Sequence, residues 1–318
     1  MEDEFLIPPN GYGAGMIKII GVGESGVNYV NNMVRAGIEG VKFMVCSTDM
    51  QTLENSPARV KVHIAGIEAD VAADIVRNIA MERSEKMRKF LDDGTKMVIV
   101  ATNMGENIGA GVTPAITRIT KELGMLTVAL VTVPSHAECD ARFKQAIDGL
   151  DKLKHVDALI EININQLVEN DTGLTITEIY AEADRIITIA AKDIAELITR
   201  TGIINLDFAD VSQTLEGGGS TSIGTATAKG LNRAREAVML ALNSPLIKNN
   251  DIANARRILM NITTGGGNNE LIASELSEIV DFVTGIAKNA SMIWAAGNDD
   301  TLEDALKITV VATDFVNI

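Results

Sequence analysis

Six residues near the start of the chain have the types and spacing needed to hold a phosphate group. Gly21-Val22-Gly23-Glu24-Ser25-Gly26 matches G-x-G-x-x-G and lies between a strand-like run, 16–21, and a helix-like run that Gly37 ends. Glycines at such a turn let backbone N–H groups approach phosphate, and the helix N-terminus adds positive potential. Because similar turns also serve tight packing alone, the motif by itself leaves phosphate binding open.

An acidic residue makes a dinucleotide cofactor the general alternative. Asp49 follows the second strand-like run, 41–47, about where a dinucleotide-binding fold contacts a ribose. No His–Asp or Lys–Tyr catalytic pair accompanies the loop. An NAD-type or other small-molecule binding protein is therefore the weaker alternative.

Bulk composition argues against several other classes. The chain has 318 residues, 46% of them hydrophobic, and 28 Lys and Arg against 43 Asp and Glu give a net charge of −15. This balance argues against nucleic acid as a partner, and no apolar run reaches the roughly 18 residues that direct membrane insertion requires. Cys46, Cys139 and the three histidines lack metal-ligand spacing, so we expect no metal site and a cytoplasmic protein.

The elements that position these residues follow a regular alternation. Continuous apolar runs at 16–21, 41–47, 96–102, 125–133 and 156–162 alternate with helical patterns, among them 70–91 and 113–124. This predicts an α/β fold with a doubly wound parallel sheet.

The second half predicts a smaller α/β domain. An amphipathic pattern at 177–201 predicts a long central helix, followed by helix, strand, helix, strand and strand. The predicted boundaries are a flexible segment 1–15, a Rossmann-type domain 16–176, the central helix 177–202 and a C-terminal domain 203–318.

Four segments point to a family. They are Asn205-Leu206-Asp207-Phe208-Ala209-Asp210-Val211 after the long helix, CSTDMQTL at 46–53, NSPL at 243–246 and ATDF at 312–315. In order and spacing they make the chain, from about residue 16 to 315, resemble the FtsZ family of the tubulin superfamily, especially the FtsZ of Bacteroidetes. The resemblance implies the tubulin/FtsZ-like fold.

The resemblance also implies an activity and a way of assembling. In that family the first domain binds GTP with magnesium, and subunits stack head to tail in filaments. The loop after the long helix inserts carboxylates into the next subunit's site, where they orient and polarise water. The matching residues are Asn205, Asp207 and Asp210, although a turn whose aspartates only cap a helix would look the same.

The nucleotide-binding positions implied by the resemblance come from both Gly-rich loops, the ribose-side loop and the long helix. They are Gly21, Gly23, Gly26, Asn28, Gly105, Gly109, Gly111, Glu138, Arg142 and Tyr180.

Several positions depart from the family pattern at the same site. Side chains replace glycines or threonines in both loops, and the two residues expected to contact the guanine base are changed. A carboxylate 4–6 Å from a triphosphate costs about 3 kcal/mol, and arginine has no acceptor for guanine N–H groups. The residues predicted to disrupt the pocket are Glu24, Val27, Glu106, Asn107, Ile108, Ile164 and Arg185.

These departures lead to one hypothesis and one alternative within the family. The hypothesis is an FtsZ-like filament protein with lost or strongly weakened GTP binding, which needs no cofactor and assembles with itself or with a conventional FtsZ. In the vacated pocket Arg185, Glu24 and Glu106 would pair with one another or with a neighbouring subunit. The alternative is an active GTPase that uses GTP and magnesium through altered loops.

Overall fold

The computed structural model describes residues 4–6, 15–64, 73–82, 84–135, 138–170, 173–200, 202–244 and 252–316. Most of the predicted flexible segment 1–15, and Pro245 and Leu246 of the NSPL segment, lie outside these residues. The chain folds into two compact units, Met1–Ala195 and Glu196–Ile318.

The first unit is built on a mostly parallel sheet with strand order β1-β4-β3-β2-β5-β6-β7. β2 lies in the middle, paired in parallel with β3 on one side and β5 on the other, and only β1 runs antiparallel to its neighbour β4. The strands are β1 Glu4–Leu6, β2 Ile17–Val22, β3 Val41–Ser47, β4 Val60–His63, β5 Met97–Asn103, β6 Leu126–Val133 and β7 Ala158–Asn163.

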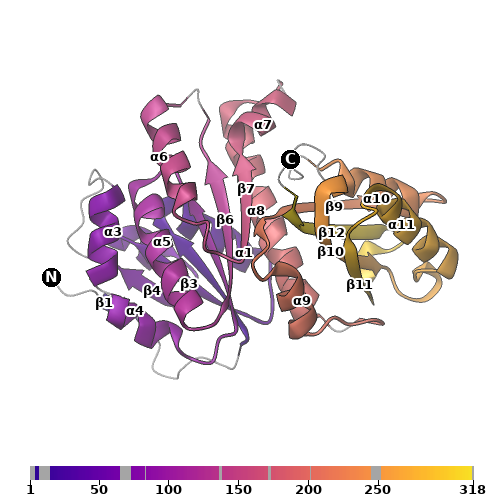
Figure 1. The fold of residues 1–318 in the computed structure, drawn as a ribbon, viewed down its shortest axis with the longest axis horizontal. Coiled ribbons are helices and arrows are strands. Elements are labelled where there is room, and N and C mark those ends of the chain that lie inside the picture. Colours follow the sequence, from indigo (N-terminus) through magenta and orange to yellow (C-terminus); the bar gives the residue numbers. More distant parts are fainter. Residues whose placement is uncertain are drawn as a thin grey trace. The chain divides into compact units, whose positions relative to one another are not determined.

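Helices cover both faces of this sheet, as a doubly wound fold requires. Ile20 and Val22 of β2 pack in one core cluster with Val112 and Ile116, whereas the neighbouring Gly21 lies under α1 on the opposite face. Figure 1 shows α3 to α6 gathered together along the first unit. The helices are α1 Gly23–Arg35, α2 Met50–Asn55, α3 Ala73–Glu82, α4 Ser84–Leu91, α5 Asn107–Glu122, α6 Asp140–Asp151, α7 Ile164–Asn170 and α8 Ile176–Thr199.

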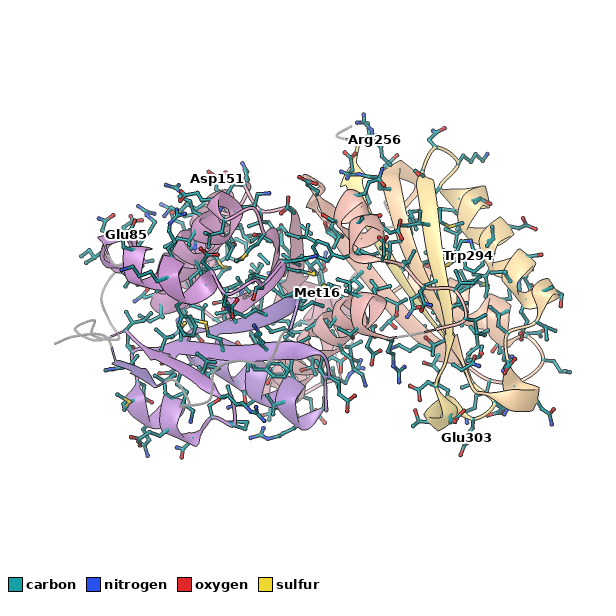
Figure 2. All side chains as sticks on the ribbon, turned by 90° about the horizontal axis from the view of Figure 1, so that it is seen from below. Met16, Glu85, Asp151, Arg256, Trp294 and Glu303 are labelled. Atoms are coloured by element: carbon teal, nitrogen blue, oxygen red, sulfur yellow. The ribbon has the colours of Figure 1, made fainter. Side chains whose placement is uncertain are left out.

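The second unit is a sheet with strand order β11-β10-β12-β9, backed by two helices. β10 pairs in parallel with β11, and β12 runs antiparallel to both β10 and β9. Trp294, partly buried, packs against the core of this unit, and Figure 2 shows Arg256 and Glu303 at opposite ends of its sheet. The elements are α9 Phe208–Leu215, β8 Gly219–Ser220, β9 Ser222–Ala228, α10 Arg233–Leu242, β10 Ala255–Thr264, α11 Ala273–Ile286, β11 Ser291–Asn298 and β12 Leu306–Phe315, with short 3-10 turns at Gly267–Asn269 and Asp300–Leu302.

The predicted fold class is confirmed, with local differences. The helix predicted at 70–91 is two helices, α3 and α4. The helix predicted at 113–124 starts earlier, at Asn107, so most of the presumed glycine loop before it is helical. The strands β1, β4, β8 and β9 were not predicted. Within the described residues, no helix is both long and apolar enough to cross a membrane.

Candidate functional site

A cavity opens at the carboxyl ends of the central strands of the first unit. The chain passes from β2 to β3 through α1 and from β5 to β6 through α5, which cover opposite faces, so the strand order reverses between β2 and β5. Open α/β sheets bind ligands at such a crevice. The cavity measures about 630 Å³ and is lined by the first turn of α1, the segments that follow β3, β5 and β6, the start of α6 and Tyr180 from α8.

The structure brings part of the predicted set to this cavity. Of the implied nucleotide-binding residues, Gly105, Glu138, Arg142 and Tyr180 line it. Of the residues predicted to disrupt the pocket, Glu24, Glu106, Asn107 and Ile108 line it as well.

The glycines of the first motif have packing roles. A Cβ at Gly21 would overlap the backbone of Gly26, and a Cβ at Gly26 would lie 2.7 Å from the carbonyl oxygen of Ala101, so both let α1 lie close to β2 and β5. Gly23 has φ +80°, a left-handed conformation that L residues adopt only with strain, and a Cβ there would overlap Oε2 of Glu106.

The Glu106 carboxylate lies at the N-terminal end of α1. Its Oε1 accepts a hydrogen bond from the backbone N–H of Ser25 at 3.1 Å and another from the Ser25 hydroxyl. Burial raises the pKa of the Glu106 carboxyl group, and the neighbouring Glu24 carboxylate adds to the rise, against the lowering effect of the hydrogen bonds from Ser25. The Glu106 carboxyl group therefore already occupies the N-terminal end of α1.

Other predicted loop residues lie away from the cavity. Val27 is 1% exposed and packs in the core from α1, so its side chain does not line the cavity. Gly109 and Gly111 are buried inside α5, where a Cβ would overlap Asn103 in the first case and lie 2.7 Å from Val76 in the second. Their small size serves helix packing.

The end of the site predicted to hold the base is also rearranged. Arg185 does not pair with Glu24 or Glu106 as predicted. It forms an ion pair with Glu182 on its own helix, with its Nε 2.7 Å from Oε2. The neighbouring Asp184 instead accepts a 2.7 Å hydrogen bond from Nδ2 of Asn28, and burial raises the pKa of the Asp184 carboxyl group.

Two further predicted residues flank this end. Burial raises the pKa of Tyr180, and its interaction with the Glu138 carboxylate raises it further. Ile164 is 2% exposed at the start of α7, and the adjacent Asn165 accepts a 2.7 Å hydrogen bond from the Ser135 hydroxyl. Ile164 is thus a core residue, and the polar groups of this segment lie beside it.

The predicted contact loop belongs to the second unit. Asn205 closes the turn that follows α8, accepting from the backbone N–H of Gly202 at 2.5 Å and donating to its carbonyl oxygen at 3.2 Å. Asp207 and Asp210 form a reciprocal capping box at the start of α9: each carboxylate accepts the backbone N–H of the other, at 2.9 and 3.0 Å. Asp207 is exposed, as is Asn205, and Asp210 is half-buried.

Four residues that form hydrogen bonds at the site were not predicted. Ser25 holds Glu106, Asp184 holds Asn28, and Gly105 is fixed by Asn103, whose Oδ1 accepts its N–H at 2.8 Å. Gln145 donates to the carbonyl oxygen of Gly105 at 3.3 Å. Ser25 lies inside the G-x-G-x-x-G motif and Asp184 lies next to Arg185, so the sequence positions of both could have indicated that they belong to the site. In the described parts of the chain no cluster of three His, Cys, Asp or Glu could hold a metal ion.

Comparison with known proteins agrees with this architecture. The family model "Tubulin/FtsZ family, GTPase domain" matches residues 16–172, and "FtsZ family, C-terminal domain" matches residues 219–316. Cell division protein FtsZ of the Bacteroidetes species Porphyromonas gingivalis is 39% identical over 99% of this chain and 71% of its own length. That of Wigglesworthia glossinidia brevipalpis is 37% identical over 94% of this chain and 79% of its own.

Solved structures give the same result. The structure of an empty FtsZ dimer from M. jannaschii has a TM-score of 0.85 at 33% identity, covering 95% of this chain and 88% of that one. A CetZ from Methanosaeta thermophila shares the fold at a TM-score of 0.78 and 16% identity, covering 95% of this chain and 88% of that one. With two family models covering both units and relatives aligned over nearly the whole chain, this protein belongs to the FtsZ family of the tubulin superfamily.

Proposed function

We propose that this chain is an FtsZ-type filament subunit of the cytoplasmic cell-division machinery in which GTP binding and hydrolysis are lost or strongly weakened. The observation that carries the proposal is the Glu106 carboxylate bound to Ser25 at the N-terminal end of α1. That is where the family's first loop would receive phosphate.

The residues at this end of the cavity do not fit the triphosphate of GTP. The backbone N–H of Ser25 already donates to Glu106, and the exposed Glu24 carboxylate lines the same cavity. At an effective dielectric constant near 20, an ionised carboxylate 4–6 Å from a phosphate costs about 3 kcal/mol, or roughly a hundredfold in affinity, and the exposed Glu24 carboxylate costs much less because solvent screens it. The cavity's Arg142 is partly compensated by Glu138, whose carboxylate lies 3.8 Å from it.

The same charges bear on assembly. We propose head-to-tail contacts through Asn205, Asp207 and Asp210. The proposed domains are the Rossmann-type domain 16–176, the central helix 177–202 and the C-terminal domain 203–318. In a filament of identical subunits, Asp207 and Asp210 would approach the acidic cavity of the next subunit. Like charges at a contact oppose association, so assembly with a conventional FtsZ, whose site lacks these two acidic substitutions, is favoured over self-assembly at low salt.

The alternative of an active GTPase has one observation in its favour. The cavity is large, and Tyr180, Glu138 and Arg142 line it at the positions that the family uses. A dinucleotide-binding protein, by contrast, gives no account of the second unit or of the family match to residues 219–316.

Assembly and turnover measured together test the proposal. The chain is sedimented and viewed by negative-stain microscopy with and without GTP and Mg²⁺, beside a phosphate-release assay on the same samples. We expect the same filaments in both conditions and no phosphate release above buffer. Micromolar GTP binding with steady phosphate release would establish the active-GTPase alternative instead.

A further inference from the structure

One side chain joins the two loops that form the phosphate end of the cavity. Glu106 follows β5, yet its carboxylate reaches the first turn of α1, directly after β2, where it accepts from both the backbone N–H and the hydroxyl of Ser25. One amide and one hydroxyl of the first turn of α1 therefore face this single carboxylate.

The side chain is not needed by its own helix. Glu106 is the N-cap residue of α5, but its side chain makes no capping hydrogen bond to that helix. Instead it crosses to α1, whose first N–H groups have no partner within the helix and carry the positive end of its dipole.

The approach is made possible by the backbone opposite. Gly23 has φ +80°, and a Cβ at this position would overlap Oε2 of Glu106. In a phosphate-binding loop, glycine lets the backbone approach a phosphate. In this chain Gly23 lets the backbone approach the Glu106 carboxylate.

We propose that Glu106 is an internal substitute for a nucleotide phosphate: it binds the first turn of α1, links the loops after β2 and β5, and excludes phosphate ligands from that position. This role of Glu106 rests on the proposed function and deepens it, because the contact with Ser25 would keep the two segments ordered without a nucleotide. The carboxylate accepts hydrogen bonds from the first turn of α1 and links that turn to the segment after β5. A bound phosphate would otherwise make these contacts.

Glu106 can oppose phosphate binding in two ways, by occupying the N-terminal end of α1 and by adding negative charge to the cavity, and variants distinguish the two. Glu24 is the matched control, because it is a neighbouring carboxylate that lines the same cavity but is exposed and does not hold the Ser25 N–H. Glu106→Ala removes charge and occupancy, Glu106→Gln removes charge and keeps an acceptor in place, and Glu24→Ala removes only a nearby charge.

The experiment compares the full chain and these three variants by calorimetric titration of GTP with Mg²⁺ and by amide hydrogen exchange over residues 23–26. We expect GTP affinity to rise about a hundredfold in Glu106→Ala, less in Glu106→Gln, and only a few-fold in Glu24→Ala, where solvent screens the exposed charge. Exchange at 23–26 should speed up in Glu106→Ala alone and slow again when GTP is added.

Each outcome decides the matter. If Glu106→Ala binds GTP no better than Glu24→Ala, or if exchange at 23–26 is unchanged in it, Glu106 is not a phosphate substitute. If the unmodified chain already binds GTP at micromolar concentration, the proposed loss of nucleotide binding fails. If, in that case, Glu106→Ala binds GTP far more tightly than the unmodified chain does, the phosphate-substitute role of Glu106 is supported even though the proposed loss of nucleotide binding has failed.

Discussion

Replacing Asp207 with alanine and with asparagine should separate its role in folding from its role in assembly. Alanine removes the oxygen that accepts the Asp210 N–H at 2.9 Å at the start of α9. Loss of an N-cap acceptor costs about 1 kcal/mol, whereas asparagine caps a helix about as well as aspartate. We therefore expect Asp207→Ala to lower the free energy of unfolding by about 1 kcal/mol and Asp207→Asn to leave it nearly unchanged.

The chain offers a convenient probe for this measurement. Trp294, the single tryptophan of the sequence, packs against the core of the unit that contains α9, so its fluorescence follows the unfolding of that unit in urea. A change of 1 kcal/mol moves the urea midpoint by roughly 0.5 M. Asp281→Ala, at an exposed position inside α11, is the control for loss of a surface carboxylate.

Sedimentation of the same variants tests the contact role. Asp207→Asn keeps the cap but removes the charge, so it should alter the fraction of protein that pellets if the carboxylate contacts a neighbouring subunit. An unchanged urea midpoint in Asp207→Ala would refute the capping argument. Wild-type sedimentation of Asp207→Asn would show that the charge of Asp207 takes no part in assembly.

Two further results are expected from the charges of the site. The pKa of Glu106 is raised in the folded chain, so ionisation of this carboxyl group lowers the free energy of unfolding. Relative to Glu106→Gln, the unmodified chain should therefore lose stability as pH rises from the ordinary glutamate range through the raised pKa. Above that pKa the difference in stability should stay constant. Thermal denaturation across pH 4 to 8 measures this difference, and a difference that grew in favour of the unmodified chain as pH rose would contradict it. Self-assembly should increase as salt is raised from about 0.01 to 0.15 M, because screening weakens repulsion between Asp207 and Asp210 and the acidic cavity; sedimentation that falls over this range would contradict the head-to-tail contact.

The sequence predicted the sheet well where apolar runs are continuous. β3, at Val41–Ser47, has the predicted bounds, and its last four residues are buried, as expected for a parallel strand with helices on both faces of the sheet. β9, at Ser222–Ala228, was missed because its sequence SIGTATA is small and polar, and its strand state comes from pairing with β12. Such pairing is a tertiary effect that overrides local preference.

At the site, sequence predicted which residues are present but not what they contact. The loss of glycine at Glu24 and Glu106 was visible, and so was the change at Arg185. The pairing of Arg185 with Glu182 follows from helical spacing and could have been predicted. The reach of Glu106 to Ser25 could not, because it depends on two distant loops meeting at the strand reversal.

The contact between Gly23 and Glu106 can be tested without any ligand. Gly23→Ala should destabilise the chain twice over: alanine at φ +80° costs about 1–2 kcal/mol, and its Cβ would overlap Oε2 of Glu106. In a Glu106→Ala background only the backbone cost is left, so the double variant should be more stable than the two single changes predict by about 1 kcal/mol or more. Urea denaturation of the four proteins, followed by circular dichroism because the tryptophan lies in the other unit, gives this coupling. Additive effects would mean that the carboxylate does not lie against Gly23 in solution, and the inferred phosphate position would then have to be placed elsewhere.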